Sequence, residues 1–164
     1  MAKASEIEVS PEPGEDEERI EFHPENSTGY LLRDTFRAFS KVLAARISAH
    51  GVTIGQWYFL RVLWEEDGLT QRELSQRVGM MEPTTVTALN GMEKRRYVRR
   101  VRSTEDRRKV HVFLTRKGRS LRNKLLPYAI EVNRFATEGV SEDDLENLRA
   151  TLRHMRDRLQ AECG

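Results

Sequence analysis

The stretch from Leu69 to Thr115 restricts the possible folds of this chain more than any other part of the sequence. It opens with the pattern of a helix start. Thr70 and Glu73 have the spacing of a capping box, and Leu69 can pack against Leu74 as a hydrophobic staple. A helix that begins immediately after Thr70 is therefore expected.

A second helix and two strands follow in the same stretch. Gly79 interrupts the first helix pattern, and Pro83 lies near the first position of the next helix, where its missing N–H costs nothing. Val98–Arg102 and Val110–Thr115 have the composition of strands, and the residues between them, 103–109, form a polar loop. Two short helices followed by a hairpin predict a winged helix-turn-helix.

Further helix patterns precede this region. From Thr28 to Ile47, apolar residues recur at steps of three and four and define one helix face: Leu32, Phe36, Phe39, Leu43 and Ile47. A second helix is expected to start at Thr53, which has capping-box spacing to Gln56, and to end at Asp67-Gly68.

Two helices are expected after the hairpin. Thr115 can cap the first, and Pro127 lies inside it and should bend it. Its apolar face comprises Leu121, Leu125, Tyr128, Val132 and Phe135. The second begins near Ser141 and has strict heptad spacing at Leu145, Leu148, Leu152, Met155 and Leu159. Such a narrow apolar seam favours pairing with another helix.

The expected fold class is mainly α with a small β-hairpin, a winged helix-turn-helix domain with N- and C-terminal dimerisation helices. The expected organisation is an acidic tail at 1–27, a helical dimerisation region at 28–50 and 116–162, and a DNA-binding domain at 51–115. With 164 residues, 38% of them hydrophobic, the chain can bury a core.

Composition also limits where the chain acts. No apolar run approaches the roughly 20 residues of a membrane span, and the N-terminal residues lack the apolar segment of a signal peptide. The single cysteine, Cys163, cannot form a disulfide within the chain. A cytoplasmic protein is expected.

The charge distribution is uneven. The net charge is only +2, but residues 92–122 contain thirteen Lys or Arg side chains and three Asp or Glu side chains. Such a concentration of one sign favours binding to a polyanion over an ordinary solvated surface. The acidic segment 1–27 is expected to be disordered; the alternative hypothesis is a tail that competes with DNA for the basic surface.

Small polar residues on the helix from Glu82 to Arg96 suggest how DNA would be read. Val86, Leu89 and Met92 are expected to face inward. The opposite face carries Thr84, Thr85, Thr87, Ala88, Asn90 and Gly91. In a major groove, threonine methyl groups can contact thymine methyl groups, and Asn90 can reach adenine or a phosphate. The alternative is a plain solvated helix face.

The loop at 103–109 supplies Arg107, Arg108 and Lys109, which can enter a narrow minor groove. Asp106 can orient Arg108 through a bidentate pair. Four further arginines are expected to contact phosphates or remain solvated: Arg95, Arg99, Arg100 and Arg102. Gln71 and Arg72, at the start of the first of the two short helices, complete the expected DNA-binding set.

These segments resemble the MarR family of winged-helix transcriptional regulators, over about residues 28–160. The resemblance is carried by Leu69-Thr70-Gln71-Arg72-Glu73-Leu74, by Glu82-Pro83-Thr84-Thr85-Val86-Thr87, and by Asp106-Arg107-Arg108 through Val110 to Gly118. It implies a dimer on palindromic double-stranded DNA, an Asp106–Arg108 pair with Arg108 in the minor groove, and a repressor released by a small molecule. One departure is Arg96, where the family often has glycine; a left-handed Arg96 would cost about 1 kcal/mol more than glycine.

The resemblance also implies a site for the effector, an aromatic acid, a phenol or an aromatic acyl-CoA, between the dimerisation helices and the winged helix. The candidates are Phe36, Phe39, Arg46, His50, Trp57 and Tyr58, with Trp64 nearby. Ordinary packing is the alternative for the aromatic residues, and an ordinary surface position is the alternative for Arg46 and His50.

Other functions are weighed against this one. Regulation by oxidation of Cys163 is one alternative, and a non-specific architectural DNA-binding protein is another. An enzyme is not expected, because the sequence lacks metal-ligand clusters, a phosphate-binding glycine loop and a nucleophile motif. No metal and no cofactor are expected.

Overall fold

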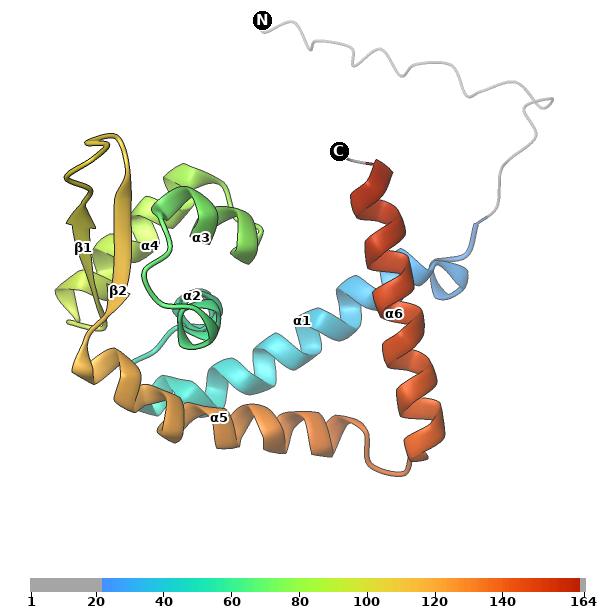
Figure 1. Ribbon diagram of the computed structural model, residues 1–164. Helices are drawn as coiled ribbons and strands as arrows, with labels where there is room; N and C mark the ends of the chain where they lie inside the picture. Colours follow the sequence, from blue (N-terminus) through green and yellow to red (C-terminus); the bar gives the residue numbers. More distant parts are fainter. Residues whose placement is uncertain (1–21, 163–164) are drawn as a thin grey trace, which may run out of the picture. The chain divides into compact units, whose positions relative to one another are not determined.

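A computed structural model describes residues 22–162 (Figure 1). Its helices and strands are a 3-10 turn Pro24–Asn26, α1 Thr28–Ile47, a 3-10 turn Ser48–His50, α2 Ile54–Glu65, α3 Gln71–Val78, α4 Glu82–Lys94, β1 Val98–Arg102, β2 Val110–Leu114, α5 Arg116–Ala136 and α6 Glu142–Glu162. These residues divide into two units between Thr35 and Phe36, inside α1. Among the described helices, none is long and apolar enough to cross a membrane.

The two expected capping boxes are confirmed. At the start of α2, Thr53 Oγ1 accepts a hydrogen bond from the Gln56 N–H at 3.2 Å, and the Gln56 side chain accepts one from the Thr53 N–H. At the start of α3, Thr70 and Glu73 make the same reciprocal pair. Gly79 ends α3 with a left-handed φ of 70°. These local signals fix where both helices begin and where α3 ends.

The expected hairpin is also confirmed. Strands β1 and β2 pair antiparallel, with Val98 opposite Leu114 and Arg102 opposite Val110. An isolated bridge between Thr70 and His111 joins the start of α3 to β2. Helix α4 contacts β1, and α3 contacts β2. Together these elements form a winged helix-turn-helix (Figure 1).

The core lies within the winged helix and the adjoining helices. Its fully or almost fully buried side chains include Phe59, Leu60, Leu63, Leu74, Leu89, Met92, Tyr97, Val98, Val112, Leu114, Leu121 and Leu125. The first turn of α5 packs closely on the backbone just before β1, where a Cβ at Gly118 would clash with the Tyr97 carbonyl oxygen. The Gly118 carbonyl accepts a hydrogen bond from Trp64 Nε1 at 3.0 Å. The start of α5 is therefore fixed to both α2 and the hairpin.

The apolar faces of the last two helices differ in burial. On α5, Leu121, Leu125 and Val132 are buried, whereas Phe135 is exposed. On α6, Leu145 is buried, but Leu148 and Leu159 are 52% and 64% exposed. Leu152 and Met155 are half-buried, so the seam of α6 is only partly covered by the described part of the chain.

Two element boundaries differ from the sequence expectations. Helix α2 ends at Glu65, before Asp67-Gly68, and β2 ends at Leu114, because Thr115 already caps α5. Helix α5 runs from Arg116 to Ala136 with Pro127 inside it. The hypotheses about Cys163 and about most of the acidic tail concern residues that lie outside the described part of the chain.

Candidate DNA-binding surface and adjoining helix junction

The exposed face of α4 is rotated from the one that the sequence suggested. Thr85 is only 1% exposed and packs inward with Leu89 and Met92, whereas Val86 is 38% exposed. The prediction that Val86 faces inward and Thr85 faces DNA is therefore wrong. Thr85 Oγ1 is buried without a hydrogen-bond partner.

Of the other residues predicted on this face, Ala88 and Gly91 are half-buried, and Ala88 packs against the core. Thr84, Thr87 and Asn90 are accessible on α4, and Thr87 Oγ1 donates a hydrogen bond to the Pro83 carbonyl at 3.1 Å. The threonine hydroxyl hydrogen is therefore used within the helix, which leaves the methyl group and an oxygen lone pair for contact with DNA. Val86 belongs to this face in place of Thr85.

Arg100 is held by side chains of α3 and α4. Its guanidinium donates to Glu93 Oε2 from Nε and NH2, at 3.0 and 2.7 Å. It also donates to Asn90 Oδ1 at 2.6 Å and to Gln71 Oε1 at 3.3 Å. The prediction that Arg100 is solvated or contacts phosphate is therefore wrong, because its donors are directed at partners within the chain.

Carboxylates near this surface remain charged over a wider acidic range than usual. The guanidinium of Arg100 holds the pKa of Glu93 below its ordinary value by hydrogen bonding. Hydrogen bonds from the backbone and the hydroxyl of Thr70 lower the pKa of Glu73 in the same way. Each carboxylate accepts hydrogen bonds in its ionised form, and these bonds favour that form.

The wing loop, residues 103–109 between β1 and β2, contains several short-range hydrogen bonds. Ser103 Oγ accepts hydrogen bonds from the N–H groups of Glu105 and Asp106. Asp106 Oδ1 accepts from the Arg108 backbone N–H at 3.0 Å and from Arg108 Nε at 3.4 Å. The Asp106–Arg108 pair is thus present, but it is not bidentate, because a single carboxylate oxygen and a single guanidinium nitrogen take part.

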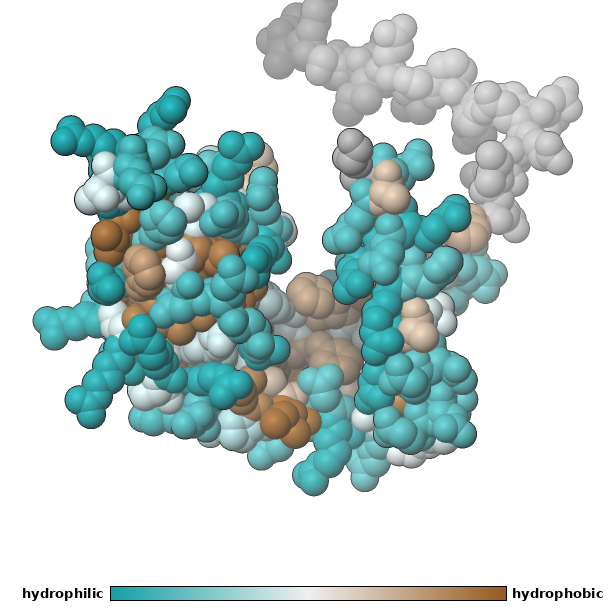
Figure 2. Space-filling view, viewed as in Figure 1, coloured by the Kyte–Doolittle hydropathy of each residue, from teal (hydrophilic) through white to brown (hydrophobic). Residues whose placement is uncertain are grey.

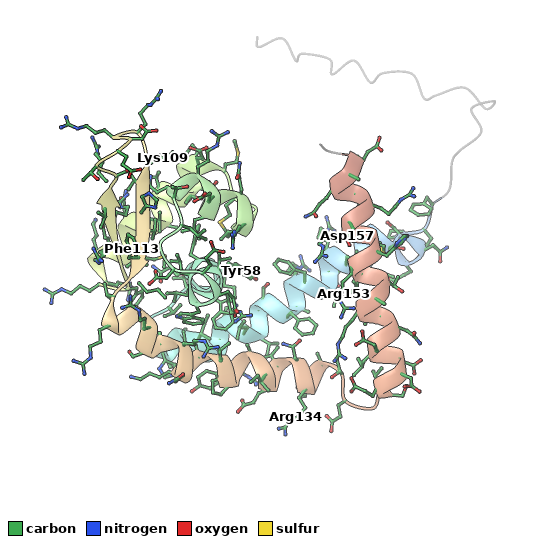
Figure 3. The ribbon with its side chains drawn as sticks, viewed as in Figure 1. Tyr58, Lys109, Phe113, Arg134, Arg153 and Asp157 are labelled. Atoms are coloured by element: carbon green, nitrogen blue, oxygen red, sulfur yellow. The ribbon has the colours of Figure 1, made fainter. Side chains whose placement is uncertain are left out.

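The wing presents its cations to solvent. The Arg108 side chain is 94% exposed although it is paired with Asp106, and Arg107 and Lys109 are exposed beside it. Figure 3 shows Lys109 at the end of the hairpin, and Figure 2 shows hydrophilic side chains projecting from the same end. Arg108 is therefore accessible to an anion outside the protein.

A depression of about 650 Å³ lies between α3, the start of α4 and the wing. It is lined by Thr70, Gln71, Arg72, Glu73, Gln76, Glu82, Asp106, Arg108, Lys109 and Val110. Five of the predicted DNA contacts thus meet around one concave surface. Arg95 does not join them, because its guanidinium lies next to Gly51 at the other end of α4.

Comparisons with known proteins agree with this geometry. The sequence model described as the MarR family matches residues 50–109. The HTH-type transcriptional regulator TtmR of Methylorubrum extorquens is 35% identical over 129 residues, which are 77% of this chain and 64% of TtmR. The crystal structure of transcriptional regulator PA3341 is 32% identical in sequence; the match covers 82% of this chain and 99% of PA3341, with a TM-score of 0.74. The crystal structure of a MarR transcriptional regulator from Methanosarcina mazei is 27% identical in sequence. The match covers 81% of this chain and 96% of that regulator, with a TM-score of 0.77.

This chain belongs to the MarR family. Its winged helix is the DNA-binding fold of these transcriptional regulators, and the expectation of a non-enzymatic protein agrees with the relatives. The chain spans somewhat less than two thirds of the length of TtmR.

In this MarR-family chain, several of the predicted effector residues pair with α5. Arg46 NH1 lies 3.2 Å from Glu131 Oε2. His50 Nε2 lies 3.2 Å from the Tyr128 hydroxyl, and the two rings are 5.5 Å apart. Sequence reasoning missed Glu131 and did not select Tyr128 for this site, because nothing in the local pattern shows which residue of α5 lies opposite α1.

The remaining aromatic candidates separate into core and surface residues. Trp57 is buried and packs edge-on against Trp64, so packing is the role that its position supports. Tyr58 hydrogen-bonds to Ser40 at 2.8 Å and stacks on Phe36, which is 59% exposed. Phe36 therefore lies outside the core of the single chain, contrary to the packing alternative, and Phe39 is half-buried.

Two depressions flank this junction. One, of about 460 Å³, is lined by Leu43, Trp57, Arg61, Leu126, Ala129, Ile130 and Asn133. The other, of about 500 Å³, is lined by Arg46, Glu131, Arg134, Phe135, Thr137 and Glu138; Figure 3 shows Arg134 on the outer side of α5. The first combines an apolar wall with a guanidinium and an amide, which is the composition of a site for a small aromatic anion.

Proposed function

We propose that this protein is a dimeric, sequence-specific DNA-binding regulator that acts in the cytoplasm as a repressor and is released from DNA by a small aromatic effector. The observation that carries the DNA-binding part is the wing: Arg108 is 94% exposed, yet Asp106 restricts its orientation. A partly oriented guanidinium loses less conformational freedom on binding than an unrestrained one. Arg108 is therefore suited to a narrow minor groove.

The surface around the wing supports binding to a duplex. Helix α4 presents Thr84, Val86, Thr87 and Asn90 on its exposed face, as a helix in the major groove would. Gln71 and Arg72 at the start of α3, and Arg108 and Lys109 in the wing, line the concave surface next to it, and Arg107 is exposed in the wing. Phosphate contacts from the cations would supply affinity, and α4 would supply sequence preference.

Replacement of Arg108 tests this proposal. Arg108→Ala should weaken binding to the operator by roughly 1 to 3 kcal/mol, because a minor-groove contact and a cation are lost together. Fluorescence anisotropy with a labelled operator at fixed salt would measure the change. Arg122→Ala, on the exposed surface of α5, removes the same charge away from the proposed surface and is the matched control. Equal affinities of the Arg108→Ala and Arg122→Ala proteins would contradict the proposed role of Arg108.

The effector part of the proposal rests on the depression at the α1, α2 and α5 junction. Its apolar lining from Leu126 and Ile130 suits an aromatic ring, and Arg61 suits a carboxylate. Arg61 already contacts Glu65 at 3.1 Å, so an incoming carboxylate would compete with an exposed ion pair of small strength. An aromatic acyl-CoA would extend from the same depression.

A thermal-shift screen tests the effector. Aromatic acids, phenols and aromatic acyl-CoA thioesters would be added to the purified protein, and compounds that raise the melting temperature would be tested for release of operator DNA. Arg61→Gln should abolish the response to a carboxylate while it leaves binding to DNA unchanged. No compound that both stabilises the protein and releases DNA, or an unchanged response in Arg61→Gln, would contradict this assignment.

A further inference from the structure

Arg100 has surroundings unlike those of the other cations of the hairpin. The Arg99 guanidinium lies over the Phe113 ring, and Arg102 is exposed. Arg100 instead points at α3 and α4, and its side chain is only 23% exposed. Its backbone N–H also donates to Glu93 Oε1 at 2.9 Å, so both carboxylate oxygens of Glu93 are bound to the same residue. This arrangement keeps Arg100 in one position.

The chemistry of the guanidinium fixes the orientation of two amide side chains. Arginine has five N–H donors and no acceptor, so an amide in contact with it must present its oxygen. Arg100 NH2 is 2.6 Å from Asn90 Oδ1, and NH1 is 3.3 Å from Gln71 Oε1. The NH₂ groups of both amides consequently face away from Arg100, and each retains two hydrogen-bond donors.

This orientation matters most for Asn90. Asn90 lies on the exposed face of α4, one turn after Val86 and Thr87. Asparagine recognises adenine with a donor and an acceptor together, because adenine presents N7 as an acceptor and N6–H₂ as a donor. Because Oδ1 faces Arg100, the side of Asn90 that faces away from Arg100 presents the two N–H donors. Guanine, whose N7 and O6 are both acceptors, is the complementary base edge.

We propose that Arg100 is a specificity-determining positioning residue that turns the NH₂ group of Asn90 toward the major groove, so that α4 selects guanine over adenine at one base pair of each half-site. This inference rests on the proposed DNA-binding function. It replaces the expectation, drawn from the sequence alone, that Asn90 reads adenine or a phosphate. Asn90 touches the base, and Arg100 acts through Asn90.

The neutralisation of Glu93 belongs to the same arrangement. Glu93 is one turn beyond Asn90 on α4, and an uncompensated carboxylate there would repel DNA phosphates. Arg100 pairs with that carboxylate at 2.7 Å. A fair test must therefore remove both charges together, so that a change in base preference is separated from a change in charge.

The double variant Arg100→Met with Glu93→Gln meets this requirement, since its net charge equals that of the wild type. Operators for the full-length wild-type protein would be selected from random DNA, and every single-base variant of the selected site would be measured for each protein. In the double variant, the preference for guanine over adenine at the Asn90 position should fall by roughly fivefold or more, because the released amide can rotate to satisfy adenine. Preferences at positions away from Asn90 and Gln71 should stay as in the wild type, because Arg100 also holds the Gln71 side chain.

Asn90→Asp is a second and independent variant. Aspartate keeps an oxygen for Arg100 but replaces the outward NH₂ group with an acceptor. The preferred base at this position should therefore change from guanine to cytosine, whose N4–H₂ group is a donor. Thermal melting of each variant verifies folding, and Asn90→Asp still decides the question if the double variant fails to fold.

The outcomes separate the inference from the function on which it rests. A wild-type protein without any sequence preference would overturn the proposed function itself. A sequence-specific wild type whose base profile is unchanged in the folded double variant would overturn only the role of Arg100. An equal loss of affinity on all sequences in Asn90→Asp would place the amide on a phosphate and would also overturn the inference.

Discussion

Thr85 and Val86 are adjacent residues whose environments are opposite to those expected. Thr85 Oγ1 is buried without a partner, and a buried hydroxyl that lacks a hydrogen bond destabilises the folded state. Val86 is exposed on the face proposed to enter the major groove. The two positions therefore separate a stability effect from a DNA-binding effect.

Replacement of Thr85 by valine should stabilise the protein. The side chains have nearly the same shape, and the change removes the unpaired hydroxyl, so the free energy of unfolding should rise by about 1 kcal/mol. Urea denaturation would measure it. Operator affinity should not change, because Thr85 is buried. Thr84→Val, at the exposed neighbouring position, is the control and should not raise stability; a loss of DNA affinity in Thr85→Val would show that Thr85 does contact DNA.

Arg96 is the one residue other than glycine with a positive φ, 59°, in the described part of the chain. A left-handed conformation costs a residue with a Cβ about 1 to 2 kcal/mol, and replacement by glycine removes this cost. Glycine is also more flexible in the unfolded chain, which offsets about half of the stabilisation. Arg96→Gly should therefore stabilise the protein by up to about 1 kcal/mol. Arg95→Gly, where φ is −84°, should not stabilise it. Thermal denaturation of both variants would check the difference, and a destabilised Arg96→Gly protein would contradict the strain.

An ion pair between Glu93 of α4 and Arg100 of β1 joins the two elements. Hydrogen bonds from Arg100 lower the pKa of Glu93 below the ordinary value of 4.5. A carboxyl group whose pKa is depressed by folding contributes stability above its unfolded pKa, and that contribution is lost as the pH falls through the folded pKa. The α4–β1 contact should therefore weaken in acid.

Glu93→Gln should make this dependence visible. Near neutral pH the wild type should be more stable than the variant, and the difference between their free energies of unfolding should decrease as the pH falls below 4.5. Denaturation by urea at several pH values would measure both. A difference that stays constant or increases in acid would contradict the contribution of the Glu93 carboxylate.

At the scale of the whole molecule, the exposed leucines of α6 favour the dimer proposed above. Leu148 and Leu159 are more than half exposed although they follow the heptad pattern of a helix that pairs. A symmetric dimer would place two copies of α4 in successive major grooves, so its half-sites should lie about 10 base pairs apart. Spacing on DNA would then be a property of the dimer and not of the winged helix.

The double substitution Leu148→Glu with Leu159→Glu should produce a monomer, because it places charges on the proposed apolar interface. Sedimentation equilibrium would measure the association state, and footprinting would measure protection of the two half-sites. Ala150→Glu, at an exposed position off the seam of α6, is the control and should remain dimeric. A dimer that persists in the double variant would remove α6 from the interface.

The sequence was sufficient for those features that depend on neighbours in the chain. The capping boxes of Thr53 and Thr70 and the end of α3 at Gly79 need only residues a few positions apart. The charge of the wing was evident for the same reason. The pairing of Asp106 with Arg108 is likewise a contact between residues two positions apart, although its geometry with a single oxygen was not foreseen.

Tertiary structure decided the features for which the local pattern allows two answers. Thr85, Leu89 and Met92 are spaced by four and three residues, and Val86, Leu89 and Met92 by three and three, so both sets fit one helix face. Only the packing of α4 on α2, α3 and β1 selects Thr85 as the buried member. The partners of Arg100 were hidden in the same way, because Gln71 and Arg100 are 29 residues apart and meet only when the hairpin folds back onto the two helices.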